Sequence, residues 1–181
     1  MKDLSEGYLS GELVYDGGLL KVRRDIVRLP DGSEAYREYI RHPGAAAILA
    51  FFDDGRILLE RQFRYPHGRD FFELPAGKLE PDEPHLETAR RELLEETGYA
   101  AAQWSRLCVI HTAIAYTDEA IEIYLARGLE KRAGASLDAG EFLETLVVPF
   151  DEALAMVKDG RITDSKSVTG LLWYATWGGG R

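Results

Sequence analysis

A change of hydrophobic periodicity limits what this chain can fold into more than any other feature of its sequence. From Leu9 to about Ile40, residues alternate with the two-residue period of β-strands. From Pro84 to Thr97 the spacing becomes helical. There Leu86, Ala89 and Leu93 fall at i, i+3 and i+7, which is the apolar stripe of an amphipathic helix. An extended β segment followed by such a helix predicts a mixed α/β protein.

The remaining elements are predicted from apolar runs and turn residues. Two apolar runs, 45–52 and 56–64, flank Asp53-Asp54-Gly55 and predict a β-hairpin, because Asp-Gly supplies the positive φ that tight turns require. Further strands are expected around 105–112, 120–126 and 142–148, and helices around 151–158 and 165–177, the latter with Asp164 as N-cap. The order, without regular βαβ alternation or a G-x-G-x-x-G motif, disfavours a Rossmann domain. It favours an α/β/α sandwich with a mixed sheet, preceded by an N-terminal antiparallel β arm.

Composition excludes several classes of protein. The 181 residues suit one hydrophobic core, and the formal net charge of −9 gives a surface that repels phosphate backbones. Binding to nucleic acid or to an anionic membrane is therefore not expected. The single cysteine, Cys108, has no intrachain partner, which fits a reducing compartment. No apolar run approaches the ~20 residues of a membrane span, and the N-terminus has no signal-peptide core, so a cytoplasmic protein is expected.

Three glutamates crowd the end of the predicted helix at 84–97. Glu92, Glu95 and Glu96 lie at i, i+3 and i+4, so their carboxylates share one face. Each like-charge pair at this spacing costs roughly 0.2–0.5 kcal/mol, and the helix dipole also disfavours anions at the C-terminus. The cluster is either a solvated acidic face or a site for a hard divalent cation, which would offset these costs.

The residues around the glutamates complete a longer pattern, G-x5-E-x7-R-E-U-x-E-E-x-G-U, in which U is bulky and apolar. Its fixed positions are filled by Gly77, Glu83, Arg91, Glu92, Leu93, Glu95, Glu96, Gly98 and Tyr99. The chain therefore resembles the Nudix hydrolases. The resemblance implies a Nudix-type α/β/α sandwich with a loop–helix–loop box, and hydrolysis of a diphosphate linked to another moiety.

The resemblance also implies roles for residues of this box. Glu92, Glu95 and Glu96 would hold Mg²⁺ or Mn²⁺ against the diphosphate, with the backbone carbonyl of Ala76 as a further ligand. Three carboxylates and a diphosphate would place a charge of about −5 in one cleft, which is unfavourable without cations. Arg91 would orient a glutamate. Glu83 would either bind metal or tie the loop to the helix, and these alternatives stay open.

Segments outside the box are similar to the ADP-ribose pyrophosphatase branch of the family; they include 60–66, 72–77 and 159–167. In that branch Arg64 would contact the substrate diphosphate or ribose, and Glu73 would lie beside the metal cleft. Glu119 is a candidate contact to the distal ribose, although residues 113–116 replace the branch's Pro-Gly turn. The expected reaction is hydrolysis of ADP-ribose to AMP and ribose 5-phosphate. The alternatives are hydrolysis of GDP-mannose or another nucleoside diphosphate sugar, and a non-catalytic Nudix-fold nucleotide-binding regulator.

Two further expectations come from the same branch. An acidic residue on the loop after the strand that contains Tyr124, at 139–144, would bind metal or act as general base; Glu141 aligns best, with Asp138 and Glu144 as alternatives. Residues 1–42 would form a β arm that makes a homodimer, and residues 43–181 would form the Nudix hydrolase domain.

Overall fold

The computed structural model describes residues 1–132, 134–137, 140 and 142–178. The chain divides into two compact units. The N-terminal unit comprises Met1–Pro43 together with His111–Glu119. The main unit comprises Gly44–Ile110 and Ala120–Arg181.

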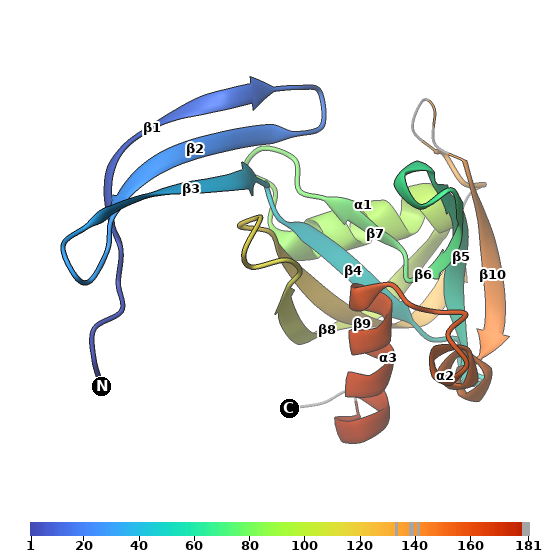
Figure 1. The fold of residues 1–181 in the computed structure, drawn as a ribbon. Helices are drawn as coiled ribbons and strands as arrows, with labels where there is room; N and C mark the ends of the chain where they lie inside the picture. The colour runs from blue at the N-terminus through green and yellow to red at the C-terminus, as the bar shows by residue number, and fades with distance from the viewer. Residues whose placement is uncertain (133, 138–139, 141, 179–181) are drawn as a thin grey trace. The chain divides into compact units, whose positions relative to one another are not determined.

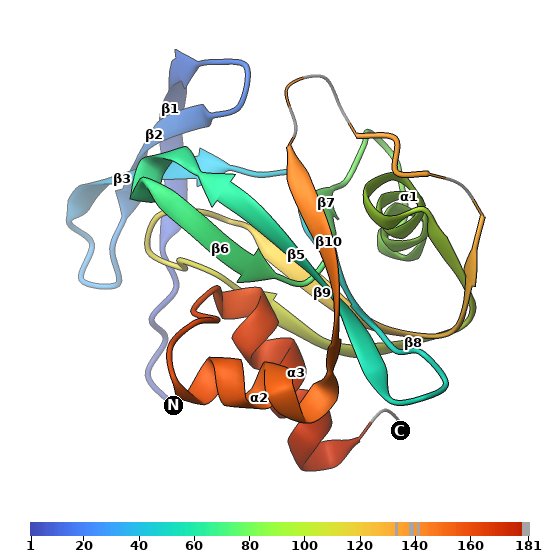
Figure 2. The same cartoon turned by 90° about the vertical axis from the view of Figure 1, so that its right-hand side faces the viewer.

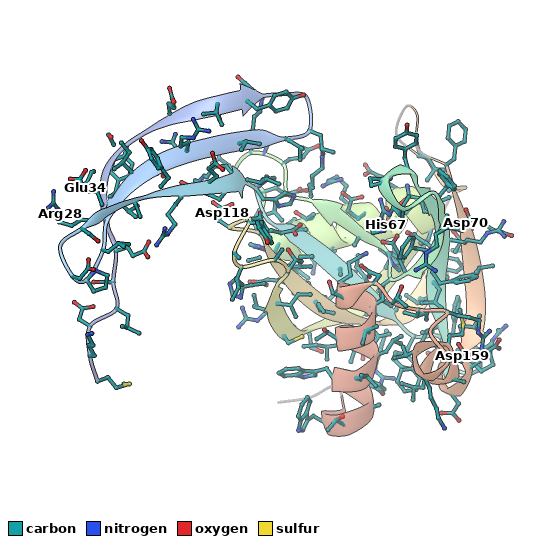
Figure 3. All side chains as sticks on the ribbon, in the orientation of Figure 1. Arg28, Glu34, His67, Asp70, Asp118 and Asp159 are labelled. Atoms are coloured by element: carbon teal, nitrogen blue, oxygen red, sulfur yellow. The ribbon has the colours of Figure 1, made fainter. Side chains whose placement is uncertain are left out.

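The N-terminal unit is built on a three-stranded antiparallel sheet in the order β1-β2-β3 (Figure 1). Its strands are β1 (Gly7–Asp16), β2 (Lys21–Arg28) and β3 (Glu34–Arg41). An ion pair between Arg28 and Glu34, with its atoms 3.2 Å apart, joins β2 and β3 beside their connecting turn (Figure 3). Every residue of β1 is exposed. The predicted antiparallel arm is therefore confirmed as a sheet.

The segment 111–119 is fastened to the end of β3 through the backbone of Ile40. The Ile40 N–H donates to the Tyr116 carbonyl at 2.8 Å, and the Asp118 N–H donates to the Ile40 carbonyl at 3.3 Å. The Asp118 carboxylate also accepts a hydrogen bond from the His42 N–H at 2.8 Å. These bonds explain why the loop clusters with the N-terminal sheet.

The described residues of the main unit form two sheets. The first, in the order β7-β4-β9-β8, is mixed, since β4 is parallel to β9 and antiparallel to β7. Its strands are β4 (Ala45–Ala50), β7 (Ala76–Lys78), β8 (Tyr99–His111) and β9 (Ala120–Lys131). The second is antiparallel in the order β10-β5-β6. It consists of β5 (Arg56–Arg64), β6 (Arg69–Glu73) and β10 (Leu143–Pro149), with the 3₁₀ helix η1 (Tyr65–His67) between β5 and β6.

In the part of the main unit that the structure describes, three α-helices cover the strands: α1 (His85–Thr97), α2 (Phe150–Lys158) and α3 (Ser165–Trp177). Alternate residues of β4 face opposite sides: Ile48 packs in one cluster with Leu93 of α1, and Leu49 packs in another with Leu171 of α3. Figure 2 shows α1 apart from α2 and α3, with strands of the main unit between them. The predicted α/β/α sandwich with a mixed sheet is confirmed. None of the described helices has both the length and the apolar composition that a membrane crossing requires.

The predicted hairpin at 45–64 is right in its turn and wrong in its pairing. Gly55 adopts a φ of 84°, and the Gly55 N–H donates to the Phe52 carbonyl. Beyond the single bridge between Phe51 and Ile57, however, β4 and β5 belong to different sheets. All six residues of β4 are buried, so β4 requires a neighbour on each edge, and β7 and β9 fill these places.

Candidate active site

Helix α1 ends where the sequence predicts, and this end positions the three glutamates. Gly98 lies in the left-handed region with a φ of 72°, and its N–H donates to the Leu94 carbonyl at 2.8 Å. Glu92, Glu95 and Glu96 consequently stand on the last two turns. Glu96 is 5% exposed, whereas the Glu95 side chain is 43% exposed. A solvated acidic face does not describe this set, because one of its members is buried.

Strand β7 lies directly against two of these carboxylates. Glu96 Oε2 accepts a hydrogen bond from the Ala76 N–H at 3.1 Å. At Gly77, a β-carbon would stand 1.8 Å from Glu92 Oε1, so only glycine leaves room for the Glu92 carboxylate here. The glycine that begins the box therefore has a steric role in the site.

Arg91 gathers the acidic side chains around one guanidinium. It donates from Nε and Nη2 to both oxygens of Glu83, at 3.0 and 2.9 Å. Its Nη1 donates to Glu92 at 2.8 Å and to Glu95 at 3.0 Å. These hydrogen bonds raise the pKa of Arg91, and the bonds from Arg91 lower the pKa of Glu83 to about 2.

Glu83 ties the loop before α1 to the helix. Its carboxylate accepts from the Glu80 N–H at 3.1 Å and from Thr88 Oγ1 at 2.8 Å, in addition to Arg91. Of the two roles left open by the sequence, the tie to the helix is thus present in the structure.

The candidate metal ligands at the end of α1 and on β7 are of a kind that suits a hard cation. Among the described residues, no three Asp, Glu, His or Cys side chains converge as a metal shell would require. At Glu92 and Glu95 the positive charge is supplied by Arg91. All the candidate ligands are nevertheless oxygens, which Mg²⁺ and Mn²⁺ prefer, and the space left by Gly77 keeps one carboxylate against β7.

A second charged group joins β5, β6 and α3. Arg64 donates from Nε and Nη2 to the two oxygens of Glu73, at 2.6 and 2.7 Å. Glu73 is 4% exposed and also accepts a hydrogen bond from Lys166. Burial raises the pKa of Glu73, but Arg64 and Lys166 outweigh that effect and lower it to about 2. Glu73 ends β6 three residues before Ala76, whose N–H donates to Glu96, so the chain brings this group next to the box.

The remaining predicted residues fall in different places. Glu119 belongs to the N-terminal unit, where its carboxylate accepts from Thr112 Oγ1 at 2.6 Å and lies 3.5 Å from His42 Nε2. Glu144 lies on β10 and pairs with Arg61 at 2.8 Å. Asp138 and Glu141 lie outside the described residues.

Sequence reasoning assigned no role to Lys166, although it is buried beside Glu73. A signal was present: a lysine in the first turn of a helix opposes the helix dipole, which favours anions there. A local rule broken in this way tends to mark a functional position.

Comparison with known proteins agrees with the box geometry. Residues 41–169 match the family profile described as NUDIX domain. The chain belongs to the Nudix family. Residues 9–40 match a second profile, the nucleoside diphosphate sugar hydrolase N-terminal domain. As a member of the Nudix family, the chain is a diphosphate hydrolase, and Nudix enzymes generally use a divalent metal.

Two curated relatives and one solved structure are similar over nearly the whole chain. The methanol dehydrogenase activator of Bacillus methanolicus is 40% identical over 168 residues, covering 92% of this chain and 91% of that protein. The ADP-ribose pyrophosphatase of Bacillus subtilis is 39% identical over 171 residues, with the same coverage. The crystal structure of an ADP compounds hydrolase aligns with a TM-score of 0.84 at 22% identity, covering 98% of this chain and 96% of that one, which supports the Nudix fold.

Proposed function

We propose that this Nudix protein hydrolyses the diphosphate of ADP-ribose to AMP and ribose 5-phosphate, with Mg²⁺ or Mn²⁺ as cofactor. One observation carries the proposal. A helix end carries three carboxylates, one of them buried against the Ala76 N–H, and Ala76 follows by three residues the Glu73 carboxylate that holds Arg64. Such a site combines ligands for a hard cation with a guanidinium for phosphate. The choice of ADP-ribose is supported by the name of the relative from Bacillus subtilis.

In this proposal Glu92, Glu95, Glu96 and the carbonyl of Ala76 hold the metal. The metal, when bound, neutralises the diphosphate and lowers the pKa of water for attack on phosphorus. Arg91 keeps Glu92 and Glu95 beside each other through Nη1. The general base is assigned to Glu141, with Asp138 and Glu144 as alternatives; Glu144 lies on β10 rather than before it. Of these, Glu144 is already paired with Arg61.

Three residues are proposed to contact substrate. Arg64 offers a planar guanidinium that suits phosphate oxygens, and Glu73 holds this guanidinium from the buried side. Glu119 is assigned to the distal ribose, since its carboxylate can accept hydrogen bonds from sugar hydroxyls. Thr112 already holds one oxygen of that carboxylate.

A phosphate-release panel tests the reaction. The chain is incubated with ADP-ribose, GDP-mannose, NADH and diadenosine polyphosphates, each with Mg²⁺ and with EDTA, and a coupled phosphatase reports the products. We expect ADP-ribose to be hydrolysed fastest, and only with the metal. If only GDP-mannose were hydrolysed, the assigned substrate would change from ADP-ribose to GDP-mannose or another nucleoside diphosphate sugar. No hydrolysis of any compound would favour the non-catalytic regulator.

The proposal includes a homodimer made by the N-terminal arm, residues 1–42. Support comes from β1, which lies at an edge of its sheet and exposes large apolar side chains such as Leu13 and Tyr15. Light scattering after size-exclusion chromatography should give twice the chain mass of 20.3 kDa. A monomer at all micromolar concentrations would contradict the dimer.

A second candidate function is activation of an alcohol dehydrogenase. It is favoured by the 40% identity to the methanol dehydrogenase activator of Bacillus methanolicus. The test adds the chain and Mg²⁺ to a purified methanol dehydrogenase and measures the rate of methanol oxidation. An increased rate would support this function, and an unchanged rate would remove it.

A further inference from the structure

Lys166 stands at a costly position that the proposed reaction has not yet explained. It is 8% exposed, and its ammonium donates to Glu73 and, at 3.0 Å, to Asp164. Even when an ammonium is paired, the loss of its water on burial can cost more than the ion pairs gain, and the first turn of α3 adds an unfavourable dipole. Such a position calls for a compensating role.

The anchoring of α3 is achieved without Lys166. Asp164 caps the helix by accepting from the Ser167 N–H at 3.0 Å. Ser167 Oγ in turn donates to Asp164 at 2.7 Å and accepts from the Leu74 N–H at 2.7 Å. The first turn is therefore already fixed to the end of β6, and the lysine charge is not required for that attachment.

Four charged side chains are linked by ion pairs that run from the interior to the surface. We call them the Lys166 cluster, which consists of Lys166, Asp164, Glu73 and Arg64. The Lys166 side chain is 10% exposed and that of Glu73 is 5% exposed. The Arg64 side chain is 44% exposed. Arg64 is thus the solvent-facing end of the cluster, and Glu73 is held from one side by Lys166 and from the other by Arg64.

The hydrogen bonds of Arg64 leave donors for a ligand. A guanidinium has five N–H donors, and Arg64 uses two of them, one at Nε and one at Nη2, to donate to Glu73. The cluster has two positive and two negative groups. Without Lys166, two carboxylates would face one guanidinium, and an anion approaching Arg64 would meet a net negative charge.

We propose that Lys166 is a positioning residue for the diphosphate: it fixes the Glu73 carboxylate so that Arg64 presents its remaining N–H donors outward, and it cancels the negative charge behind them. The inference rests on the proposed function, because it requires a diphosphate substrate at Arg64. It assigns the lysine to substrate affinity and leaves the chemical step to the box glutamates.

The test compares Lys166→Met with Lys166→Arg, which keeps the charge. Lys158→Met is the matched control, because Lys158 is an exposed lysine at the end of α2. For each variant, KM and kcat for ADP-ribose are measured at saturating Mg²⁺. We expect Lys166→Met to raise KM about tenfold while kcat stays within about twofold, and Lys166→Arg to recover most of the affinity. Lys158→Met should leave both constants at the wild-type values.

A binding measurement separates this inference from the reaction itself. Inorganic pyrophosphate is titrated calorimetrically into each protein at saturating Mg²⁺, because three carboxylates and a diphosphate repel one another without a cation, and the pyrophosphate is checked to be intact afterwards. We expect wild type to bind pyrophosphate and Lys166→Met to bind about tenfold more weakly. If wild type binds pyrophosphate in this manner but hydrolyses nothing in the panel, the proposed function fails and the role of Lys166 stands.

Other outcomes overturn the inference. Lys166 would be a structural residue if its loss lowered stability in urea while KM and pyrophosphate affinity matched Lys158→Met. The same holds if wild type showed no binding of pyrophosphate. Should Lys166→Met fail to fold, Lys166→Gln keeps a hydrogen-bond donor without the charge and takes its place. Failure of both to fold would assign Lys166 to the fold and refute the positioning role.

Discussion

Arg91 and Glu83 form a two-bond pair, in which Nε and Nη2 of the arginine donate to the two carboxylate oxygens at 3.0 and 2.9 Å. The pair connects the loop before α1 to the second turn of the helix. Because the same guanidinium donates from Nη1 to Glu92 and Glu95, its position is set before any substrate arrives. One side chain thus orders both the loop and two candidate metal ligands.

Arg91→Lys is predicted to lower kcat/KM for the substrate about 10- to 100-fold. A lysine keeps the charge but has one ammonium, which cannot reproduce the fork to Glu83 and still reach Glu92 and Glu95. Steady-state kinetics with Mg²⁺ measure the loss. Arg90→Lys is the control on the same helix, since Arg90 is exposed and pairs only locally with Glu87. Equal kinetics for the two variants would contradict the ordering role of Arg91.

Glu96→Gln and Glu95→Gln are each predicted to lower kcat by at least about a hundredfold. Each change removes a carboxylate charge proposed to hold the metal, while its size and shape are kept. Circular dichroism should show the same fold, and Glu87→Gln, on the exposed face of α1, should keep wild-type turnover. Unchanged turnover of the Glu96 and Glu95 variants at saturating Mg²⁺ would remove the metal assignment.

The contribution of Glu73 to the stability of the fold is predicted to be lost in acid. The pKa of Glu73 is lowered from 4.5 to about 2, so the folded state binds fewer protons than the unfolded state in this range. The contribution of Glu73 is therefore complete above about pH 4.5 and is lost as the pH falls towards 2. Urea unfolding should show Glu73→Gln less stable than wild type at pH 6, by a difference that shrinks as the pH falls below 5.

Glu130→Gln is the control for that titration, because the Glu130 side chain is 64% exposed. The free energy of unfolding of Glu130→Gln should differ little from that of wild type at every pH. The free energies of unfolding of Glu73→Gln and wild type could instead differ by the same amount down to the lowest pH at which the chain is folded. That result would refute the dependence of stability on the protonation of Glu73.

Features set by neighbouring residues were predictable from the sequence. The end of α1 at Gly98 and the start of α3 at Asp164 depend on a left-handed glycine and on a side-chain cap, and both signals act within four residues. The shared face of the three glutamates follows from helical spacing in the same way. These parts of the candidate site were accessible because their geometry is local.

Features set by distant residues were not predictable. The turn at Gly55 is visible in the sequence, but the separation of β4 and β5 depends on pairing with β9 and β10, far along the chain. Lys166 and Glu73 are 93 residues apart, so no spacing rule connects them. The strand β8 begins at Tyr99, whereas the sequence predicts its start near Ser105. The earlier start is not visible in the sequence, because Ala100–Ala102 give no alternation of apolar and polar residues.

Gly77→Ala is predicted to impair the site while the fold survives. The added β-carbon would stand 1.8 Å from Glu92 Oε1 and 2.0 Å from its carboxyl carbon, so the Glu92 carboxylate must turn away from β7. The clash meets the end of a flexible side chain rather than backbone, which makes the cost to stability small. Titration of Mg²⁺ in the activity assay should therefore show a raised metal requirement, about tenfold or more, with little change in thermal unfolding. Gly18→Ala is the matched control, since no atom lies within 4 Å of its added β-carbon and its φ is not positive. A metal requirement equal to that of Gly18→Ala would show that the packing of Glu92 against β7 does not matter for metal binding.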